Sequence, residues 1–424
     1  MKVLIVNTYD TGGAGKASAR LHMGLLDANI DSKLLLAVKN NDFPESFLLR
    51  PKGRKTFIQK IENKLFKILK EFKIVKTRRK NKKERFVAKR STGLELYTYP
   101  DSNFDITASD LYKEADLINL HWVSNFLDYK QFFTKNTKPV VWTLHDMNPF
   151  SGGEHYKETF LGINDQGKPI NRQLSTLEKE QFKSILKIKT EALEPVENLH
   201  FVTLCHWMTN EIKQSGFFSK FPVTCIPNGI NTTIFKPRHK EYSRDLLQLS
   251  CSKKVVLFVA DSISNHRKGY AFLKRAFNLI EDENIILLAI GAKTNLLMNN
   301  NKVVELGHIK NEQLLSVAYS AADVFVIPSL MDNLPNTVLE ALLCGTPVIG
   351  FPVGGIRDMI QNGKNGLITN TISVAALSQA INAFFKTGVQ LTSEEIRQDA
   401  LTKYDQKIQA NNYIELFKKI LKKP

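Results

Sequence analysis

The sequence has few cysteines and lacks a long apolar run. Its four cysteines are scattered, with no CxxC or Cys/His metal-ligand pattern (Cys205, Cys225, Cys251, Cys344). This scarcity argues against a disulfide framework or a structural zinc site and favours a reduced compartment. Only four consecutive apolar residues precede Asn7, and no later run approaches the roughly 18 residues that span a bilayer. We therefore expect a cytoplasmic protein, free or peripheral on the inner face of the cell membrane.

Acidic residues are scarce in residues 51–90, which hold 17 lysines and arginines against three acids and so carry most of the net charge of +17. Within this segment apolar residues recur at helical spacing among lysines (Phe57, Ile61, Leu65, Ile68, Leu69, Phe72). Such a pattern suits an anionic membrane surface, contacted through residues 57–90, but a helix packed on its own domain explains it equally well. Nucleic acid could also be attracted by this charge, but we see no recognisable nucleic-acid-binding motif in the segment and do not expect such binding.

The chain is too long for a single core, and its apolar segments form two series. The first series comprises KVLIVN, SKLLLAV, DLINLHW, PVVWTLHD, HFVTLC and VTCIPNG, and the second KKVVLFVAD, NIILLAIG, KVVELG, DVFVIPS and TPVIGFP. Helical or loop segments separate the strands, which predicts an α/β protein with two Rossmann-like, doubly wound parallel-sheet domains around a central cleft. We assign residues 1–222 to the first domain, with 51–90 as an insert, and residues 223–402 to the second.

A glycine-bearing loop, Thr11 to Gly15, follows the first strand and opens a helix. Its backbone amides, Gly13 among them, suit a phosphate approached at a helix N-terminus. The loop matches neither the P-loop nor the dinucleotide-binding pattern. A plain strand-to-helix turn is the alternative interpretation.

Two carboxylates, Asp332 and Glu340, stand eight positions apart where a strand passes through an irregular loop into a helix. At this spacing they are suited to accept hydrogen bonds from separate parts of an extended polyol. The backbone amides of Asn336 and Thr337, near the helix start, are suited to a diphosphate. A capped helix with one solvated acid is the alternative.

Basic and histidine side chains follow other strands at their carboxyl ends. Arg267 and Lys268 precede a glycine on a strand-to-helix loop and can neutralise a diphosphate, although a solvated basic turn has the same pattern. In the first domain, His145 and Asp146 end a buried strand. We place Asp146 with His121, His155 and Glu154 as candidates for contact with an acceptor. For the histidines, a structural hydrogen-bonding role is the alternative.

The segment from Asp332 to Glu340 reads D-x7-E and resembles the acidic E-x7-E motif of the retaining GT-B glycosyltransferases of family 4. The stretch IPNGINTTIFKP resembles the interdomain signature of that family, and LGHIKNEQLLSVAYSAADVFVIPS resembles the segment beside its nucleobase pocket, which includes Gly307 and Ile309. These stretches cover most of the C-terminal half. The resemblance implies a GT-B fold in which residues 403–424 form a helix that packs back on the first domain.

The resemblance also implies roles for individual residues. Glu340 matches the residue that holds the ribose hydroxyls, and Asp332 replaces the glutamate aimed at the donor sugar. His145 matches a histidine that lines the donor-sugar pocket. Many family members have an arginine several residues before the Lys-Gly pair, and Arg267 is the substitute here. We therefore expect His145, Asp332, Lys268 and Arg267 to be the catalytic residues.

The expected activity is transfer of a glycosyl group from a nucleoside-diphosphate sugar to a saccharide or lipid-linked hydroxyl acceptor, with retention of configuration. Positive side chains would replace a divalent metal, so we expect no metal and no cofactor. Bacterial polysaccharide or lipid-linked oligosaccharide assembly is the expected setting, by analogy with the family. A GT-B nucleotide-sugar epimerase and a non-catalytic membrane-surface scaffold are the alternatives.

Overall fold

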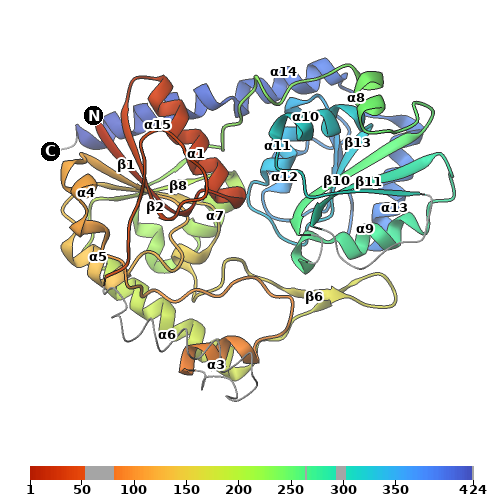
Figure 1. The fold of residues 1–424 in the computed structure, drawn as a ribbon. Coiled ribbons are helices and arrows are strands. Elements are labelled where there is room, and N and C mark those ends of the chain that lie inside the picture. Colours follow the sequence, from red (N-terminus) through yellow and green to blue (C-terminus); the bar gives the residue numbers. More distant parts are fainter. Residues whose placement is uncertain (53–80, 263–264, 293–301, 423–424) are drawn as a thin grey trace, which may run out of the picture.

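The computed structural model describes residues 1–52, 81–262, 265–292 and 302–422, in two domains that lie side by side (Figure 1). The amphipathic helix predicted from Phe57 to Phe72 lies outside the described residues. Each domain contains a parallel sheet with helices packed on it. This arrangement confirms the predicted α/β class with two doubly wound domains.

The N-terminal domain is built on a seven-stranded sheet in the order β3-β2-β1-β4-β5-β8-β9. Its strands are β1 (Lys2–Tyr9), β2 (Asp31–Val38), β3 (Ser46–Leu48), β4 (Leu117–Leu120), β5 (Val140–Leu144), β8 (Leu199–Thr203) and β9 (Val223–Cys225). Its helices are α1 (Gly12–Asp27), α3 (Lys82–Lys89), α4 (Asp110–Glu114), α5 (Tyr129–Lys135), α6 (Thr176–Leu193) and α7 (His206–Lys213), with short 3-10 turns η1 (Ile106–Ala108), η2 (Asn148–Phe150) and η3 (Gly216–Lys220). The central strands are buried on both faces, which explains their continuous apolar sequences.

The C-terminal domain is built on a six-stranded sheet in the order β12-β11-β10-β13-β14-β15. Its strands are β10 (Lys254–Ser262), β11 (Ile285–Ala292), β12 (Val303–Gly307), β13 (Val324–Ile327), β14 (Val348–Gly350) and β15 (Gly366–Ile368). Its helices are α8 (Lys240–Leu246), α9 (Tyr270–Phe277), α10 (Glu312–Ala321), α11 (Asn336–Leu343), α12 (Ile356–Met359), α13 (Val374–Thr387) and α14 (Ser393–Tyr404), and the 3-10 turn η4 (His266–Lys268) precedes α9. In both sheets the strand order reverses beside the first strand, the usual position of a ligand crevice in open α/β sheets.

Two features refine the predicted domain limits. Strand β9 begins at Val223, just beyond the predicted join, yet it pairs with β8 and forms the edge of the N-terminal sheet. The first domain therefore extends past residue 222. The last helix, α15 (Gln406–Leu421), packs against α1 of the N-terminal domain, and the Tyr413 hydroxyl lies 2.8 Å from that of Thr143. Both chain termini consequently lie on the N-terminal domain (Figure 1).

A hairpin missed by the sequence analysis connects the domains. Its strands, β6 (Phe160–Ile163) and β7 (Pro169–Asn171), form a two-stranded sheet that extends from the N-terminal domain beneath the C-terminal one (Figure 1). At its tip, Arg275 of α9 donates to the carbonyl oxygens of Asn164 and Asp165, and the Val374 amide donates to Gly167. The strands are too short for the alternating apolar pattern to identify them.

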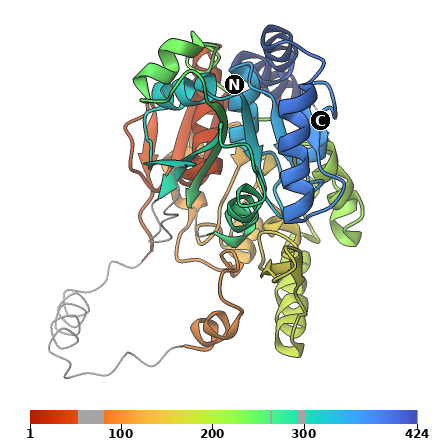
Figure 2. The ribbon, with the colours of Figure 1, turned by 90° about the vertical axis from the view of Figure 1, so that its right-hand side faces the viewer.

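Helix α3 and the first turns of α6 lie at the bottom of the views in Figures 1 and 2, whereas the end of α6 buries Leu193 in the core of the N-terminal domain. No helix among the described residues has an apolar stretch long enough to cross a membrane.

Candidate functional site

Three loops of the C-terminal domain meet where β10 and β13 end. The first is η4, the second runs from Pro328 to Pro335, and the third is the turn at Gly354 and Gly355. A Cβ atom on Gly355 would lie 1.9 Å from the Asn333 carbonyl oxygen, so the second and third loops touch backbone to backbone. Gly355 thus fixes the position of the Pro328–Pro335 loop, which carries Asp332 and is called the acidic loop below.

Gly269, which ends η4, sets the approach of the first loop to the second. It has φ of 69°, and a Cβ atom there would lie 1.7 Å from the Pro328 carbonyl oxygen. We expect Gly269→Ala to lower the free energy of unfolding by at least about 3 kcal/mol, because backbone strain and a steric clash add. As a control, Gly363→Ala should cost only about 1 kcal/mol, because Gly363 also has positive φ but nothing within 4 Å of its Cβ position. Equal losses in denaturant titrations would contradict this account.

The predicted acidic and basic residues meet in this place. The Lys268 ammonium lies 2.8 Å from Oδ2 of Asp332, and Nη1 of Arg267 lies 3.2 Å from Oδ1. Burial would raise the pKa of Asp332, but the two cations and the Ser329 hydroxyl outweigh it and lower that pKa. Asp332 is therefore an ionised, internally paired carboxylate at neutral pH.

Arg267 and Lys268 differ in how much of their binding capacity is used. Arg267 also bonds Glu95 at 2.6 Å and the Met331 carbonyl at 2.7 Å, and its guanidinium stacks 4.6 Å above the Tyr156 ring. Its side chain is 11% exposed, whereas that of Lys268 is 27% exposed and pairs only with Asp332 among the described residues. Lys268 is thus the cation better able to bind an incoming anion.

Glu95, which the sequence analysis did not identify, comes from the N-terminal domain. Its carboxylate accepts from both Arg267 and Asn265. Burial opposes its charge, but Arg267 and Asn265 lower its pKa. An isolated glutamate in a loop carries no sequence signal of such a cross-domain ion pair.

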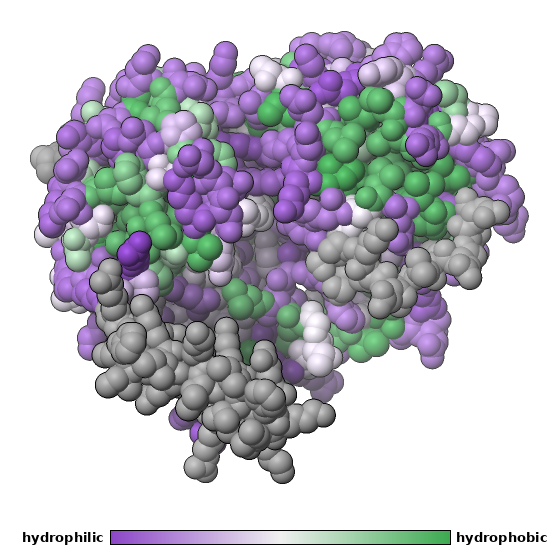
Figure 3. All heavy atoms as spheres, in the orientation of Figure 1, coloured by the Kyte–Doolittle hydropathy of each residue, from purple (hydrophilic) through white to green (hydrophobic). Residues whose placement is uncertain are grey.

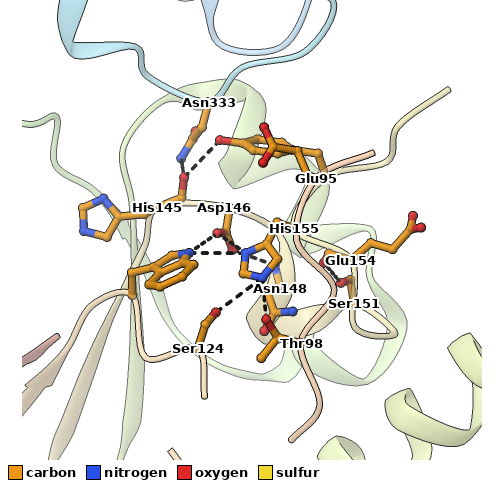
Figure 4. Close-up of polar contacts among 12 residues, drawn as sticks. Glu95, Thr98, Ser124, His145, Asp146, Asn148, Ser151, Glu154, His155 and Asn333 are labelled. Carbon is orange, nitrogen blue, oxygen red and sulfur yellow. Dashed lines mark hydrogen bonds and ion pairs between the residues drawn. The ribbon is translucent and has the colours of Figure 1, made fainter. Parts of the chain in front are cut away.

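Asn333 was also missed, and it connects the acidic loop to the opposite domain. Its side-chain amide donates to the Leu144 carbonyl oxygen at 2.9 Å and to that of His145 at 3.1 Å; Figure 4 shows the contact with His145. Its oxygen lies 3.1 Å from Sγ of Cys205. The end of β5, which carries His145, is thereby held against the loop that carries Asp332.

His145 and His121 form a stacked pair in the N-terminal domain. Nε2 of His145 lies 2.8 Å from Nδ1 of His121, and the ring centroids are 5.1 Å apart. Burial lowers the pKa of His145 to about 4, with a smaller opposing effect from Asp146, and it lowers the pKa of His121 as well. Both rings are therefore neutral at pH 7 and can donate or accept a hydrogen bond.

Asp146 and His155 lie beside this pair but bind each other. Oδ2 of Asp146 accepts from His155 and from the Trp122 indole, both at 2.6 Å, while Oδ1 accepts from the Asn148 amide (Figure 4). The other His155 nitrogen contacts Thr98 and Ser124. Burial opposes the charge on Asp146, but His155 and its other donors lower its pKa. The network supports a small pocket whose lining includes His121, Trp122, His145 and Asp146. Glu154, the remaining acceptor candidate, pairs with Arg90 and Arg172.

The remaining donor-site candidates lie on both sides of the junction between the domains. The Asn336 side chain, at the start of α11, donates to the Gly13 carbonyl at 3.1 Å, next to Thr337. A Cβ atom on Gly13 would meet nothing within 4 Å, so the space beside this loop is open. Hydrophilic residues line the junction on the face seen in Figure 3. Gly307 ends β12, and Ile309, two residues later, packs against the hydrophobic core; within the described part of the chain neither makes a polar contact with the other candidates.

Glu340 lies one helical turn after Asn336 and is buried. Its Oε1 lies 3.2 Å from Arg20 of α1, and its Oε2 accepts from the Tyr319 hydroxyl at 3.2 Å. Among the described residues, no group of three or more His, Cys, Asp or Glu side chains could hold a metal ion. The site as a whole combines one accessible cation, amides at a helix start, paired carboxylates and a neutral histidine. Such a set can bind a diphosphate and several hydroxyl groups.

The whole chain resembles solved glycosyltransferase structures. Sucrose-phosphate synthase from Thermosynechococcus elongatus superimposes with a TM-score of 0.68 at 18% identity, over 99% of each chain. HepE from Anabaena, in complex with UDP and glucose, superimposes with a TM-score of 0.66 at 16% identity, again over 99% of each chain. The two facing Rossmann-like domains are thus the GT-B fold.

Sequence comparisons match the C-terminal domain to a known family. Residues 253–387 match the family model of glycosyl transferases group 1. The chain is 28% identical over 191 residues to an uncharacterized glycosyltransferase, MJ1607, from Methanocaldococcus jannaschii, over 42% of this chain and 48% of that protein. It is 28% identical over 187 residues to the putative teichuronic acid biosynthesis glycosyltransferase TuaC from Bacillus subtilis, over 43% and 46%. The chain thus spans about half the length of these relatives.

Proposed function

We propose that the chain is a retaining, metal-independent glycosyltransferase that moves a sugar from a nucleoside-diphosphate donor to a hydroxyl acceptor. The observation that carries this proposal is the position of the Lys268–Asp332 pair. Asp332 of this pair lies on the loop that Asn333 holds against His145 of the other domain, and Lys268 reaches it from η4. The Lys268 cation and the Asp332 carboxylate of one domain thereby lie near the neutral His145 of the other. Transfer of a sugar between two substrates calls for such groups at one place.

The largest chemical demand is the negative charge that develops on the leaving diphosphate. Lys268, the amides at the start of α11 and the Gly13 loop are preorganised to stabilise it. Because these groups supply positive charge at the leaving group, the proposal assigns no role to a divalent cation and requires no cofactor.

Asp332 and His145 would act on the sugar. Asp332 is bound by two cations and Ser329, which supports a hydrogen-bonding role toward the sugar over a nucleophilic one. The proposed retention therefore proceeds without a covalent enzyme intermediate, and the donor phosphate takes the acceptor proton. The neutral His145 ring supplies a hydrogen bond to the donor sugar.

The acceptor is proposed to be a saccharide or a lipid-linked saccharide in bacterial polysaccharide assembly. The similarity to TuaC, a putative teichuronic acid biosynthesis glycosyltransferase, supports this setting. Because HepE was solved with UDP, UDP is the first nucleotide to test. Residues 57–90 are proposed to contact an anionic membrane from the cytoplasmic side. In the described part of this segment, α3 presents exposed Lys82, Lys83, Arg85 and Lys89.

A turnover assay tests the reaction itself. UDP- and GDP-sugars are incubated in EDTA with a bacterial lipid and oligosaccharide extract as acceptor, and nucleotide release and product anomers are measured. We expect release that depends on the extract, persists in EDTA and gives a product with the donor's anomeric configuration. An inverted product, or a strict requirement for metal, would contradict the corresponding part of the proposal. An altered sugar released without any acceptor would favour an epimerase.

A further inference from the structure

Arg20 is an N-terminal-domain residue that reaches into the C-terminal domain. It lies on α1, which faces α11 across the junction (Figure 1). Its Nη2 atom lies 2.7 Å from Oε1 of Glu312 and 3.2 Å from Oε1 of Glu340. Only 8% of the residue is exposed, so this bridge is shielded from water. A guanidinium in such a place is strongly attracted to carboxylates.

The Arg20–Glu340 ion pair lies beside a second contact between the same two helices, made by Gly13 and Asn336. Gly13 and Arg20 are seven residues apart on α1, and Asn336 and Glu340 are four apart on α11, so each pair lies on one face of its helix. Gly13 meets Asn336, and Arg20 meets Glu340. Helices α1 and α11 therefore contact each other at two places along the proposed nucleotide site.

Arg20 is the strongest of the neighbours that favour a charge on Glu340. Burial, with a smaller contribution from Glu312, raises the pKa of Glu340 above its ordinary value, and Arg20 and Lys16 offset only part of that rise. The other groups that face this carboxylate are the Tyr319 hydroxyl and the Cys344 thiol. A carboxylate that is to accept two ribose hydroxyl protons must be ionised, since a protonated one is itself a donor.

Arg20 also has hydrogen-bonding capacity left over. Its Nη1 atom is buried and has no hydrogen-bond partner among the described residues. A buried donor without a partner is costly, and an oxygen atom of a bound nucleotide would satisfy it.

We propose that Arg20 is a positioning residue of the donor-nucleotide site: its Nη2 atom pairs with Glu340 and orients that carboxylate toward the ribose, and its Nη1 atom is left for a nucleotide oxygen. The inference rests on the proposed function. Both domains then contribute to the nucleotide site, because the residue that orients the Glu340 carboxylate toward the ribose belongs to the N-terminal domain. Nucleotide affinity then depends on the contact between α1 and α11.

Calorimetric titration of the full chain tests this proposal. The probe is whichever of UDP, GDP, ADP and CDP stabilises the wild type most. Arg20→Met should weaken binding at pH 7.5 by about 30-fold, and Arg20→Lys, which keeps the charge but not the second donor, by about fivefold. Arg275→Met is the matched control, since this arginine also bridges the domains but its hydrogen bonds go to the carbonyl oxygens of Asn164 and Asp165 at the hairpin tip. It should change affinity by less than about twofold.

Two further readouts separate positioning from a general structural role. The double variant Arg20→Met/Glu340→Gln should bind within about threefold of the weaker single variant, because both changes disable one carboxylate. In Arg20→Met, affinity should fall more steeply than in the wild type as pH drops from 8 to 6, because Glu340 loses its closest cation and protonates more readily. Arg20→Lys serves as the folded comparison if Arg20→Met unfolds.

The outcomes distinguish this inference from the function on which it rests. If no nucleotide binds the wild type, the proposed function fails and the role of Arg20 fails with it. If the wild type binds but Arg20→Met binds equally well with an unchanged pH profile, only the inference is overturned. Tighter binding by Arg20→Met would also overturn it, since Arg20 would then compete with the ribose for Glu340.

Discussion

Replacing Lys268 with alanine should lower kcat/KM for the donor by about two to three orders of magnitude, since a preorganised charge at the leaving group is lost. The effect should be large because Arg267 cannot substitute for it. Arg267 is held by Glu95, Asp332 and the Met331 carbonyl, whereas Asp332 is the single partner of Lys268 in the described part of the chain. Steady-state kinetics with the preferred donor measure the loss.

The matched control is Lys254→Ala. Lys254 begins β10 and pairs with Asp282 at 2.9 Å, so it is also a lysine paired with one aspartate, but it lies at the end of β10 away from η4. Its loss should leave kcat/KM unchanged within about twofold. A Lys268→Ala enzyme that retains wild-type kcat/KM would contradict the assignment of the leaving-group cation.

Asp332→Ala should have the largest effect on stability, about 3–5 kcal/mol, because it leaves two cations beside a buried site without their carboxylate. Asp332→Asn should cost less but should still abolish most of the transfer activity, because the amide cannot hold both Lys268 and Arg267. Denaturant titrations give the stability loss, and donor turnover gives the activity.

The stability effect should depend on pH in a defined direction. The folded-state pKa of Asp332 lies below its ordinary value of 3.8, so its ionised form stabilises the fold above that value. This contribution disappears as pH falls through the folded-state pKa. The stability difference between wild type and Asp332→Asn should therefore be full at pH 7 and shrink below about pH 4.

Asp323→Asn is the control for both measurements. Asp323 also pairs with one lysine and one arginine, Lys240 and Arg244, but it precedes β13, at the end of the sheet away from the site. Its replacement should cost stability and leave donor turnover intact. Loss of turnover in Asp323→Asn equal to that in Asp332→Asn would show that turnover reports folding alone.

The two-domain fold could be predicted because its long strands are buried on both faces. The segments around β1, β5, β10 and β11 read as continuous apolar runs, and the helices between them require a parallel sheet. Short edge elements gave no such signal. Strands β3 and β15 and the β6–β7 hairpin have three or four residues each, and their positions are decided by contacts with distant segments.

The candidate site was predictable where residues cluster in the sequence and not where they cluster only in space. The D-x7-E spacing and the Arg-Lys-Gly turn identified Asp332, Glu340 and Lys268. Glu95 and Arg20 are isolated charges whose partners lie 172 and 320 residues away. No local pattern can indicate such contacts, because they depend on how the two domains meet.

The most direct test of the donor site is thermal unfolding of the wild type and of Lys268→Ala in EDTA, with UDP, GDP, ADP or CDP at millimolar concentration. A ligand that binds only the folded state raises its melting temperature. The proposed donor site predicts that at least one nucleotide stabilises the wild type in EDTA and that the shift is reduced in Lys268→Ala. If none of the four nucleotides stabilises the wild type, the proposed donor site is contradicted and a non-catalytic role becomes the better account.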